Sequence, residues 1–596
     1  MPANSTRSRH PPTVRALLGA ALAWLAPGLL FAQSSSCPWP GLTGSFVQPA
    51  LADSWTGTQW DQEYTYMGDA CLDQLVLQWT ADSKAHTAVY PTSLTVAGYT
   101  YTQNTVHDVV GKALTHADEN GVQVFIGLQT NSDWFVNYAN NTTWLNNEAT
   151  IAEALANDLW TKYGSHTSFA GWYLGFELDN LNEPTQTQWN AIASFYTAVG
   201  NYLHTLAPGK PVIIAPFFNT AVGMSASGYQ TMFQSILSQS PVDIVALQDG
   251  IGAGHATVSD LPVWYQAMQN AVQQAGHRVR FWSDAETYVI NSGFHPGSIG
   301  QLVADMTAED PYVSNFLSFS YNHYMSPQQV LPAYNATYLN YLATQTVETT
   351  PPTLPTSLTA TPASSISINL SWMASTDNFG VVGYQLYRNS SLVATLYGTG
   401  TTFSDSQLNS GTTYTYALTA FDAAGNFSPQ SAAAMATTPT GTVYPTDLAL
   451  NRPYTASIPA DPAYPDINGT KLTDGVYAAS PPLLSDTAWQ GRNTGSQYTF
   501  TIDLGAIQTI HEVNTDWMQY VAGTVLLPQT VTYLVSTDNV NWTPVGQVNQ
   551  PAVGNGTLAQ KYRVTGLSAV SGRYVQIQVQ PASASWTLID EAQVLQ

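Results

Sequence analysis

Two stretches of this chain place a glutamate just past an apolar run. They are GWYLGFELD at 171–179 and RVRFWSDAE at 278–286. Successive side chains of a strand point to opposite faces, so Glu177 shares a face with Gly175 and Asp179, away from the bulky apolar residues. Glycoside hydrolysis needs one carboxylic acid to protonate the leaving oxygen and one carboxylate to attack or to activate water. Glu177 and Glu286 are therefore candidate catalytic residues, provided that the fold brings both to one cavity.

Eight predicted strands must position these glutamates. Amphipathic segments such as 106–121 and 194–209 lie between them, which indicates parallel pairing with right-handed crossovers. Eight such units in about 280 residues predict a (β/α)8 TIM barrel, in which the chemistry lies at the carboxyl ends of the strands. An open doubly wound sheet is the alternative, but no glycine-rich phosphate loop follows the first strand. The predicted strands are 44–49, 72–82, 122–129, 169–179, 211–219, 242–250, 279–286 and 315–324.

The other strand ends carry amides and aromatic rings, which suit hydroxyl recognition and stacking. Each residue alone is explained as well by a structural role, since strand ends also need caps, but together they favour a site. The NEP at 182–184 lies past the strand at a predicted helix start, where the helix dipole favours Glu183. We expect substrate binding by Gln78, Trp79, Gln129, Asp179, Asn219, Asp249, Tyr288, Asn322 and Tyr324.

The N-terminus predicts export from the cell. Arg7, Arg9 and Arg15 precede an apolar run that ends at Ala32, which predicts a secretory signal over residues 1–32 and a secreted protein. Pro27 interrupts this run, so a membrane anchor is the weaker interpretation. In an exported chain the two cysteines, Cys37 and Cys71, are expected to form a disulfide, although two unpaired thiols remain the alternative.

Composition restricts the partners. The formal net charge is -23 with only 9% charged residues, which disfavours nucleic acid and anionic membranes. No HExxH or GxSxG motif is present, so we expect no cofactor for catalysis and no ordinary serine esterase. We expect a monomer that binds a polysaccharide or oligosaccharide substrate.

The pattern changes after a barrel predicted over 37–345. A Thr/Pro-rich linker at 346–353 precedes short alternating strands at 354–438, which predict a small β-sandwich. This segment resembles a fibronectin type III module. In that resemblance Trp372 is the core tryptophan, and LNSGTTYTY contains the tyrosine corner.

Residues 446–596 are again rich in predicted strands. The stretches LNRPYTAS, LTDGVYA, STDNVNWTPVG and GRYVQIQV resemble the discoidin, or coagulation-factor C-type, family. That resemblance implies a discoidin-like jelly roll acting as a carbohydrate-binding module. It also implies a structural Ca²⁺ near Asp474 and Glu591, although Asp-Gly is equally good turn chemistry.

The barrel itself resembles the clan of retaining glycosidases whose acid/base follows strand four and whose nucleophile follows strand seven. GWYLGFELDN, LQDGIGAGH and FWSDAETY are more closely similar to a bacterial barrel family of unknown function in the glycoside hydrolase superfamily. The resemblance implies Glu177 as acid/base and Glu286 as nucleophile. One departure is Phe176, where many clan members have an asparagine that holds the sugar 2-hydroxyl. This departure bears on the retaining mechanism and on which glutamate is acid/base and which is nucleophile. It does not bear on the choice of Glu177 and Glu286 as the catalytic pair.

These observations favour a secreted glycoside hydrolase with two accessory modules. A non-catalytic glycan-binding or adhesion protein on a degenerate barrel is the alternative, because a barrel fold hosts many functions. A lyase acting on an acidic polysaccharide is disfavoured, since the barrel is short of the basic residues that neutralise uronates.

Overall fold

The structure is a computed structural model, and it describes residues 37–596 apart from 292, 407, 441–445, 480–481, 521–523, 551–556, 568–569 and 583–584. The predicted secretory signal at 1–32 lies outside the described residues. Within the described part of the chain, no helix is both long and apolar enough to cross a bilayer.

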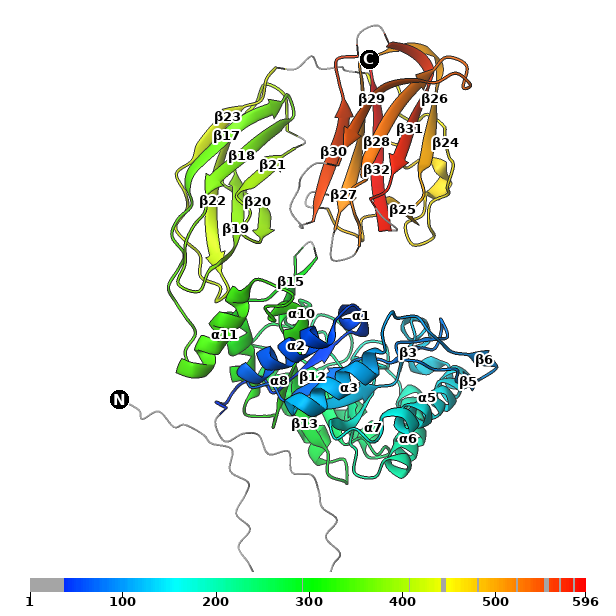
Figure 1. Cartoon of the computed structure of the whole chain (residues 1–596), viewed down its shortest axis with the longest axis vertical. Helices are drawn as coiled ribbons and strands as arrows, with labels where there is room; N and C mark the ends of the chain where they lie inside the picture. Colours follow the sequence, from blue (N-terminus) through cyan, green and yellow to red (C-terminus); the bar gives the residue numbers. More distant parts are fainter. Residues whose placement is uncertain are drawn as a thin grey trace, which may run out of the picture. The chain divides into compact units, whose positions relative to one another are not determined.

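A parallel eight-stranded sheet forms a nearly closed barrel (Figure 1), as the sequence predicts. The backbone N–H of Thr43, just before the first strand, donates to the carbonyl of Phe316 in the last strand at 2.8 Å. In their order around the sheet, the strands are β1 (Gly44–Val47), β2 (Gln74–Leu77), β8 (Gln123–Gly127), β10 (Phe169–Leu174), β11 (Val212–Ile214), β12 (Ile244–Gln248), β13 (Arg280–Glu286) and β16 (Phe316–Phe319).

Helices connect the strands and cover the outside of the barrel. Thr56 and Thr185 begin α2 and α6 with capping boxes, in which the cap side chain and the third helical residue satisfy each other's backbone N–H. The helices are α2 (Gly57–Asp69), α3 (Val109–Asn120), α5 (Thr142–Tyr163), α6 (Gln186–Leu206), α7 (Ala226–Leu237), α8 (Leu261–Gln273), α9 (Ile299–Glu309) and α11 (Pro332–Thr344).

The observed strands are shorter than predicted: β10 ends at Leu174 and β11 at Ile214, where the predictions extended to 179 and 219, and two other strands give way to new elements. β2 ends at Leu77, and the residues beyond it form β3 (Ala81–Asp82) in a small separate sheet with β4 (Thr87–Ala88), β7 (Thr102–Gln103) and β9 (Gln129–Thr130). β16 ends at Phe319, and the one-turn helix α10 (Tyr321–Tyr324) follows. The Ser320 side chain accepts the N–H of His323, so it caps a helix instead of continuing the strand.

The barrel has an inner and an outer core, as the alternation of side chains predicts. Trp172, Leu174 and Phe176 pack in the outer cluster against the helices, whereas Tyr173 lies in the inner cluster. The inner cluster contains Phe46, Val76, Phe125, Ala170, Tyr173, Ile213, Ala215, Ile244, Ala246, Trp282 and Leu317.

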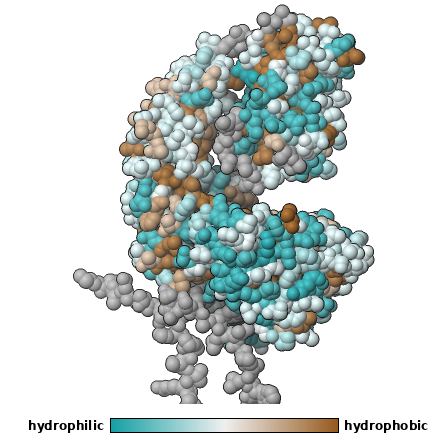
Figure 2. All heavy atoms as spheres, in the orientation of Figure 1, coloured by the Kyte–Doolittle hydropathy of each residue, from teal (hydrophilic) through white to brown (hydrophobic). Residues whose placement is uncertain are grey.

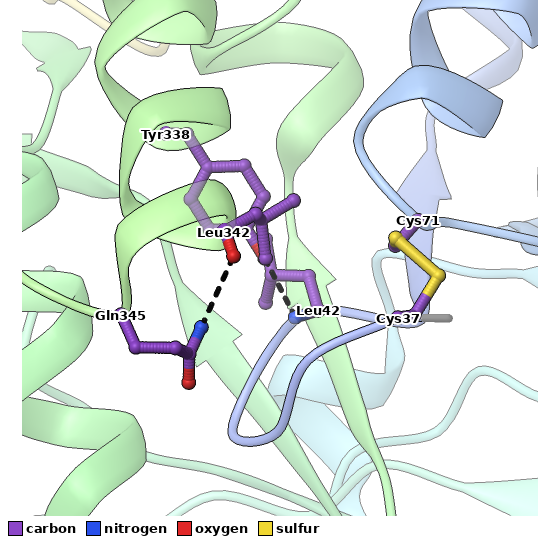
Figure 3. Close-up of a disulfide and its surroundings, with 6 residues drawn as sticks. All are labelled: Cys37, Leu42, Cys71, Tyr338, Leu342 and Gln345. Carbon is purple, nitrogen blue, oxygen red and sulfur yellow. Dashed lines mark hydrogen bonds between the residues drawn. A yellow bond between two sulfur atoms is a disulfide. The ribbon is translucent and has the colours of Figure 1, made fainter. Parts of the chain in front are cut away.

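A disulfide joins Cys37 and Cys71 (Figure 3). It ties the segment before β1 to the turn between α2 and β2. The backbone N–H of Leu42 donates to the hydroxyl of Tyr338 in α11 at 2.7 Å, so the entry to the barrel is also fixed to its last helix.

The segment after the barrel forms a seven-stranded sandwich. Trp372 is buried in its core, and the N–H of Asn409 donates to the hydroxyl of Tyr414 at 2.8 Å, which is the geometry of a tyrosine corner. One sheet contains β17 (Thr356–Ser364), β18 (Ser367–Met373) and β21 (Thr402–Asp405). The other contains β20 (Ser391–Tyr397), β19 (Val381–Arg388), β22 (Thr413–Asp422) and β23 (Ala434–Thr437).

The C-terminal segment forms a second antiparallel sandwich. Its core includes Phe500, Trp517, Tyr533 and Ile577. The five-stranded sheet contains β24 (Tyr454–Ala456), β26 (Tyr498–Ile510), β31 (Val570–Gln580), β28 (Thr530–Ser536) and β29 (Thr543–Asn549). The four-stranded sheet contains β25 (Gln490–Thr494), β32 (Ser585–Leu595), β27 (Glu512–Gln519) and β30 (Leu558–Val564).

Candidate active site

Glu177 lies three residues beyond the carboxyl end of β10, and its side chain is half-buried. The Trp134 indole donates to its backbone carbonyl at 3.0 Å, and the Gln248 side chain at the end of β12 hydrogen-bonds its carboxyl group. Burial and, to a smaller extent, the charge of Glu286 raise the pKa of Glu177 to about 7, against the hydrogen bond from Gln248, which lowers it. This carboxyl group can therefore hold a proton near neutral pH.

Glu286 is the last residue of β13 and is 6% exposed. The N–H of Ala253 donates to its Oε2 at 2.7 Å, and the Tyr288 hydroxyl and the Gly252 N–H also hydrogen-bond the carboxylate. Burial raises the pKa of Glu286 to about 7, while these three hydrogen bonds oppose the rise. The surroundings of Glu286 thus favour the anion more than those of Glu177 do.

The glycine-rich stretch QDGIGAGH wraps around the Glu286 carboxylate. Asp249 accepts the N–H of Ile251 at 2.9 Å and the N–H of Glu286 at 3.1 Å, so it joins the loop to the end of β13. A Cβ on Gly252 would lie 2.3 Å from the Tyr288 carbonyl oxygen and 3.2 Å from Glu286 Oε2. Only glycine lets the backbone approach the carboxylate this closely.

The two glutamates lie within electrostatic reach of each other at the same end of the barrel. Glu286 contributes to the raised pKa of Glu177. Tyr173, in the barrel interior, has its pKa raised by burial first and then by the charges of Glu177 and Asp284. Glu177, beyond β10, and Glu286, at the end of β13, thus follow two strands that lie three apart in the order of the sheet.

Three further buried acids beside Glu286 were not predicted from the sequence. Asp284 on β13 is 2% exposed, and its Oδ1 has no hydrogen-bond partner. Asp305 and Glu309 on α9 are fully buried, and Ser283 donates to Glu309 at 2.6 Å. Burial raises the pKa of all three carboxyl groups. The sequence feature that could have indicated the two helical acids is the spacing of Asp305 and Glu309, four residues apart in a largely apolar helix.

Two of the predicted substrate-binding residues lie together beside Glu286. The rings of Tyr288 and the half-buried Tyr324 have centroids 5.6 Å apart. Tyr324 comes from α10 rather than from a strand end. Gln78 and Trp79 are half-buried just past the end of β2.

Other predicted binding residues have their polar groups engaged by the protein. Gln129 donates to the backbone carbonyl of Glu148 at 2.9 Å, and Asn322 donates to the carboxylate of Glu63 at 2.7 Å. Asn322 is fully buried, so its predicted contact with substrate does not fit its position. The reason is that the chain turns into α10 after Phe319.

The side-chain oxygens of Asp179 and Asn219 accept backbone N–H groups of turns, which accounts for the presence of these residue types. Asp179 accepts the N–H groups of Leu181 and Asn182 at 2.6 and 2.7 Å, and Asn219 accepts the N–H of Ala221 at 2.9 Å. Asp249 is similar, because it is fully buried and its oxygens accept backbone N–H groups.

Glu183 lies two residues before Thr185, the cap residue of α6, so the predicted helix start is confirmed. It is fully buried, its Oε1 has no hydrogen-bond partner, and burial raises its pKa to about 8.

A cavity of about 10 Å³ adjoins Glu286, lined by residues that include Ile251, Tyr288, Gln301 and Met325. The buried hydroxyl of Thr287, which also lines it, has no hydrogen-bond partner in the protein. This volume holds about one water molecule. A water here, rather than a sugar ring, fits the space.

In the C-terminal module, Glu591 is 1% exposed and accepts the N–H of Gly475 at 2.7 Å, while its Oε1 has no partner. Burial, together with the nearby charges of Asp447, Asp474 and Asp590, raises the pKa of Glu591 to about 9. Asp474 also accepts the N–H of Val476. A buried carboxylate oxygen without a partner, amid other acids, fits a hard cation, with backbone carbonyls and waters completing six to eight oxygens.

Two known domain families match the chain. Residues 42–331 match the family described as Domain of unknown function (DUF4434), and residues 455–592 match the F5/8 type C domain. The first match spans the barrel from before β1 to beyond β16. The barrel is therefore similar to DUF4434 domains, and the C-terminal module is similar to F5/8 type C domains.

Curated relatives match only parts of the chain. Chitinase A1 from Niallia circulans is 35% identical over 174 residues, which are 26% of this chain and 24% of the chitinase. Exoglucanase B from Cellulomonas fimi is 47% identical over 95 residues, which are 16% of this chain and 8% of the exoglucanase. The chain thus spans about a quarter or less of the length of these relatives.

A solved structure is also similar to the chain. The endo-beta-1,4-mannanase from Thermotoga petrophila is 11% identical with a TM-score of 0.36, and the match covers 67% of this chain and 98% of that chain.

Proposed function

We propose that the barrel hydrolyses O-glycosidic bonds of a polysaccharide or oligosaccharide, with Glu177 as the general acid/base and Glu286 as the nucleophile. The observation that carries this proposal is the pair of carboxyl groups at one end of the barrel, with the pKa of Glu177 raised by burial and, to a smaller extent, by the charge of Glu286. A carboxyl group with a raised pKa can hold a proton while its neighbour is ionised. One acid and one base are then present together near neutral pH.

The surroundings of the two carboxyl groups decide their roles. Glu286 receives hydrogen bonds from Tyr288, Gly252 and Ala253, which stabilise its anion. Glu177 receives a single side-chain hydrogen bond, from Gln248. The proton of the pair therefore resides on Glu177, which protonates the leaving oxygen while Glu286 attacks the anomeric carbon.

Asp249 serves this reaction as a positioning residue. It holds the loop that donates the N–H of Ala253, and it fixes the backbone of Glu286 itself. Substrate contacts fall instead to Gln78, Trp79, Tyr288 and Tyr324, whose side chains are not fully buried or lie beside Glu286. Phe176 stacks on Trp134 with ring centroids 5.2 Å apart, so another group must hold the 2-hydroxyl if retention applies.

The C-terminal module has a supporting role in the proposal. It tethers the secreted, monomeric enzyme to glycan and raises the effective concentration of substrate at the barrel. A Ca²⁺ bound by Glu591 and Asp474 stabilises this module. Chelation with EDTA should then lower the unfolding temperature of the module, and added Ca²⁺ should restore it. An unfolding temperature that EDTA leaves unchanged would contradict the proposed Ca²⁺ site.

Substitution of the two glutamates tests the hydrolase proposal. Glu177→Gln and Glu286→Gln should each abolish the release of reducing sugars while leaving the fold intact. Proton NMR of the first-formed product then reads the anomer and tests retention. Glycan retention without turnover by the unsubstituted protein would favour a non-catalytic binding protein.

A further inference from the structure

The barrel rim beside Glu177 exposes large apolar side chains in three consecutive loops. Phe135 and Val136 follow β8 and are 59% and 79% exposed, Leu181 follows β10 and is 49% exposed, and Val222 follows β11 and is 44% exposed. Other exposed apolar side chains of the barrel, such as Val106 and Val263, lie far from these loops in the sequence, and the barrel face drawn in Figure 2 is largely hydrophilic. Neighbouring exposed apolar side chains mark an interaction site.

The first of these loops is fixed directly to Glu177. Trp134, next to Phe135 in helix α4 (Trp134–Asn137), stacks on Phe176 with ring centroids 5.2 Å apart and an interplanar angle of 9°. Its indole N–H donates to the Glu177 carbonyl at 3.0 Å. Phe135 therefore projects from a short segment that is anchored to the backbone of the acid/base.

The second and third loops are joined through Asn180. Its side-chain amide donates to the carbonyls of Asn219, Val222 and Met224 at 3.0, 2.7 and 3.0 Å. The backbones touch, since a Cβ on Gly223 would lie 2.9 Å from the Cα of Leu181. The exposed apolar side chains thus rise from one continuous and well-braced rim.

Charged groups on these loops are paired or buried. Asp133 forms an ion pair with Lys84 at 2.6 Å. Asp179 is 2% exposed and is occupied by turn N–H groups, and Glu183 is fully buried. A surface with apolar side chains and no free charge suits the C–H faces of neutral sugars and offers nothing to an acidic polymer.

We propose that this rim, formed by Phe135, Val136, Leu181 and Val222, binds neutral sugar residues of a glycan chain that extends from the Glu177 side of the site. The Phe135 ring supplies the stacking surface. The identity of the bound molecule rests on the proposed function. The inference adds that the substrate is a chain of sugars rather than a single sugar on a small leaving group.

Affinity electrophoresis of the full chain tests the rim. The probes are soluble galactomannan, mixed-linkage β-glucan and glycol chitin, and every variant carries Glu286→Gln so that a bound chain is not cut. Phe135→Ala should weaken retention by at least one glycan about five- to tenfold, the usual range for one aromatic contact. Phe427→Ala is the matched control, because Phe427 is 49% exposed on the fibronectin-like module. Leu181→Ser provides a second rim variant if Phe135→Ala does not fold.

The outcomes separate the rim from the hydrolase. If all three glycans retain the rim variants as strongly as the control, or retain none of these proteins, the proposed glycan binding by the rim is overturned. This holds even if the unsubstituted protein is a hydrolase. Retention that depends on Phe135, without sugar release by the unsubstituted protein, supports the rim and rejects the hydrolase. In an active enzyme, Phe135→Ala should raise KM for the glycan chain by a larger factor than it lowers kcat/KM for an aryl monosaccharide glycoside.

Discussion

Glu177 and Glu286 carry the proposed chemistry at the scale of single residues. Their positions could be predicted because Glu286 ends β13 and Glu177 follows β10, and apolar and polar side chains alternate in both stretches. Asp305 and Glu309 could not be placed in the same way, because a helix approaches the sheet at an angle that its sequence does not state. The contacts of Asn322 and Gln129 were also hidden, since their partners Glu63 and Glu148 lie on distant helices.

Removing one charge should shift the pKa of the other glutamate. Glu286→Gln deletes the negative charge that raises the pKa of Glu177, so this pKa should fall from about 7 towards the ordinary 4.5, without reaching it because burial remains. The measurement is a carbon-13 NMR titration of glutamate side chains. Glu63→Gln is the control, since Glu63 is also buried and has a raised pKa but hydrogen-bonds Asn322 and Ser326. An unchanged pKa of Glu177 in the Glu286→Gln variant would show that the two carboxyl groups do not interact.

The pH dependence of activity follows from the same pair. Above about pH 7 the rate should fall, because Glu177 loses the proton that it donates. Well below pH 7 the rate should fall again as Glu286 becomes protonated. The profile of kcat/KM against pH checks both limbs. A rate that keeps rising to pH 9 would be incompatible with a neutral Glu177 as the acid.

At the scale of elements, the strand order and the inner and outer faces followed from periodicity, while the strand ends did not. β16 ends where Ser320 caps α10, and β2 ends before the small sheet that contains β3. Both are local choices between a strand and a cap or turn that hydrophobic patterning does not resolve. The role of the stretch QDGIGAGH could not be predicted either, because the group that it hydrogen-bonds is the carboxylate of Glu286 at the end of the next strand.

Gly252→Ala tests the loop as an element. The new Cβ would lie 2.3 Å from the Tyr288 carbonyl, so the backbone must move and the Ala253 hydrogen bond to Glu286 must lengthen. Since displacement of a catalytic group by about 1 Å costs on the order of 100-fold in rate, we expect a loss of that size in kcat. Gly68→Ala in α2 is the control, because its Cβ meets nothing within 4 Å. Equal rates for both variants would remove the loop from the mechanism.

At the scale of the whole molecule, the chain buries many acids and carries few bases to neutralise them. It has 39 Asp and Glu residues against 16 Lys and Arg. Within the barrel, the raised pKa values reach about 7 for Glu63 and about 8 for Glu183, with burial as the largest cause. The barrel therefore contains buried carboxyl groups that are protonated near neutral pH.

Stability should accordingly be highest in acid. A carboxyl group whose pKa is raised on folding stabilises the fold fully below its unfolded pKa, near 4.5, and this stabilisation is lost as pH rises through the folded pKa values of about 7 to 8. A tenfold change in the acid dissociation constant of a single group corresponds to about 1.4 kcal/mol. Thermal unfolding of the full chain should therefore show a temperature that falls from pH 5 to pH 8. Glu63→Gln should reduce this fall, and a midpoint that increases with pH would contradict a barrel that contains protonated carboxyl groups.

The release of reducing ends from a panel of neutral polysaccharides, by the unsubstituted full chain and by Glu177→Gln and Glu286→Gln, tests the proposed hydrolysis most directly. We predict that at least one glycan is cut and that each substitution lowers its rate by about 1000-fold or more, as expected for a group that acts in the chemical step. Cleavage that survives both substitutions, or negligible cleavage by all three proteins while glycan is retained, would contradict the proposal.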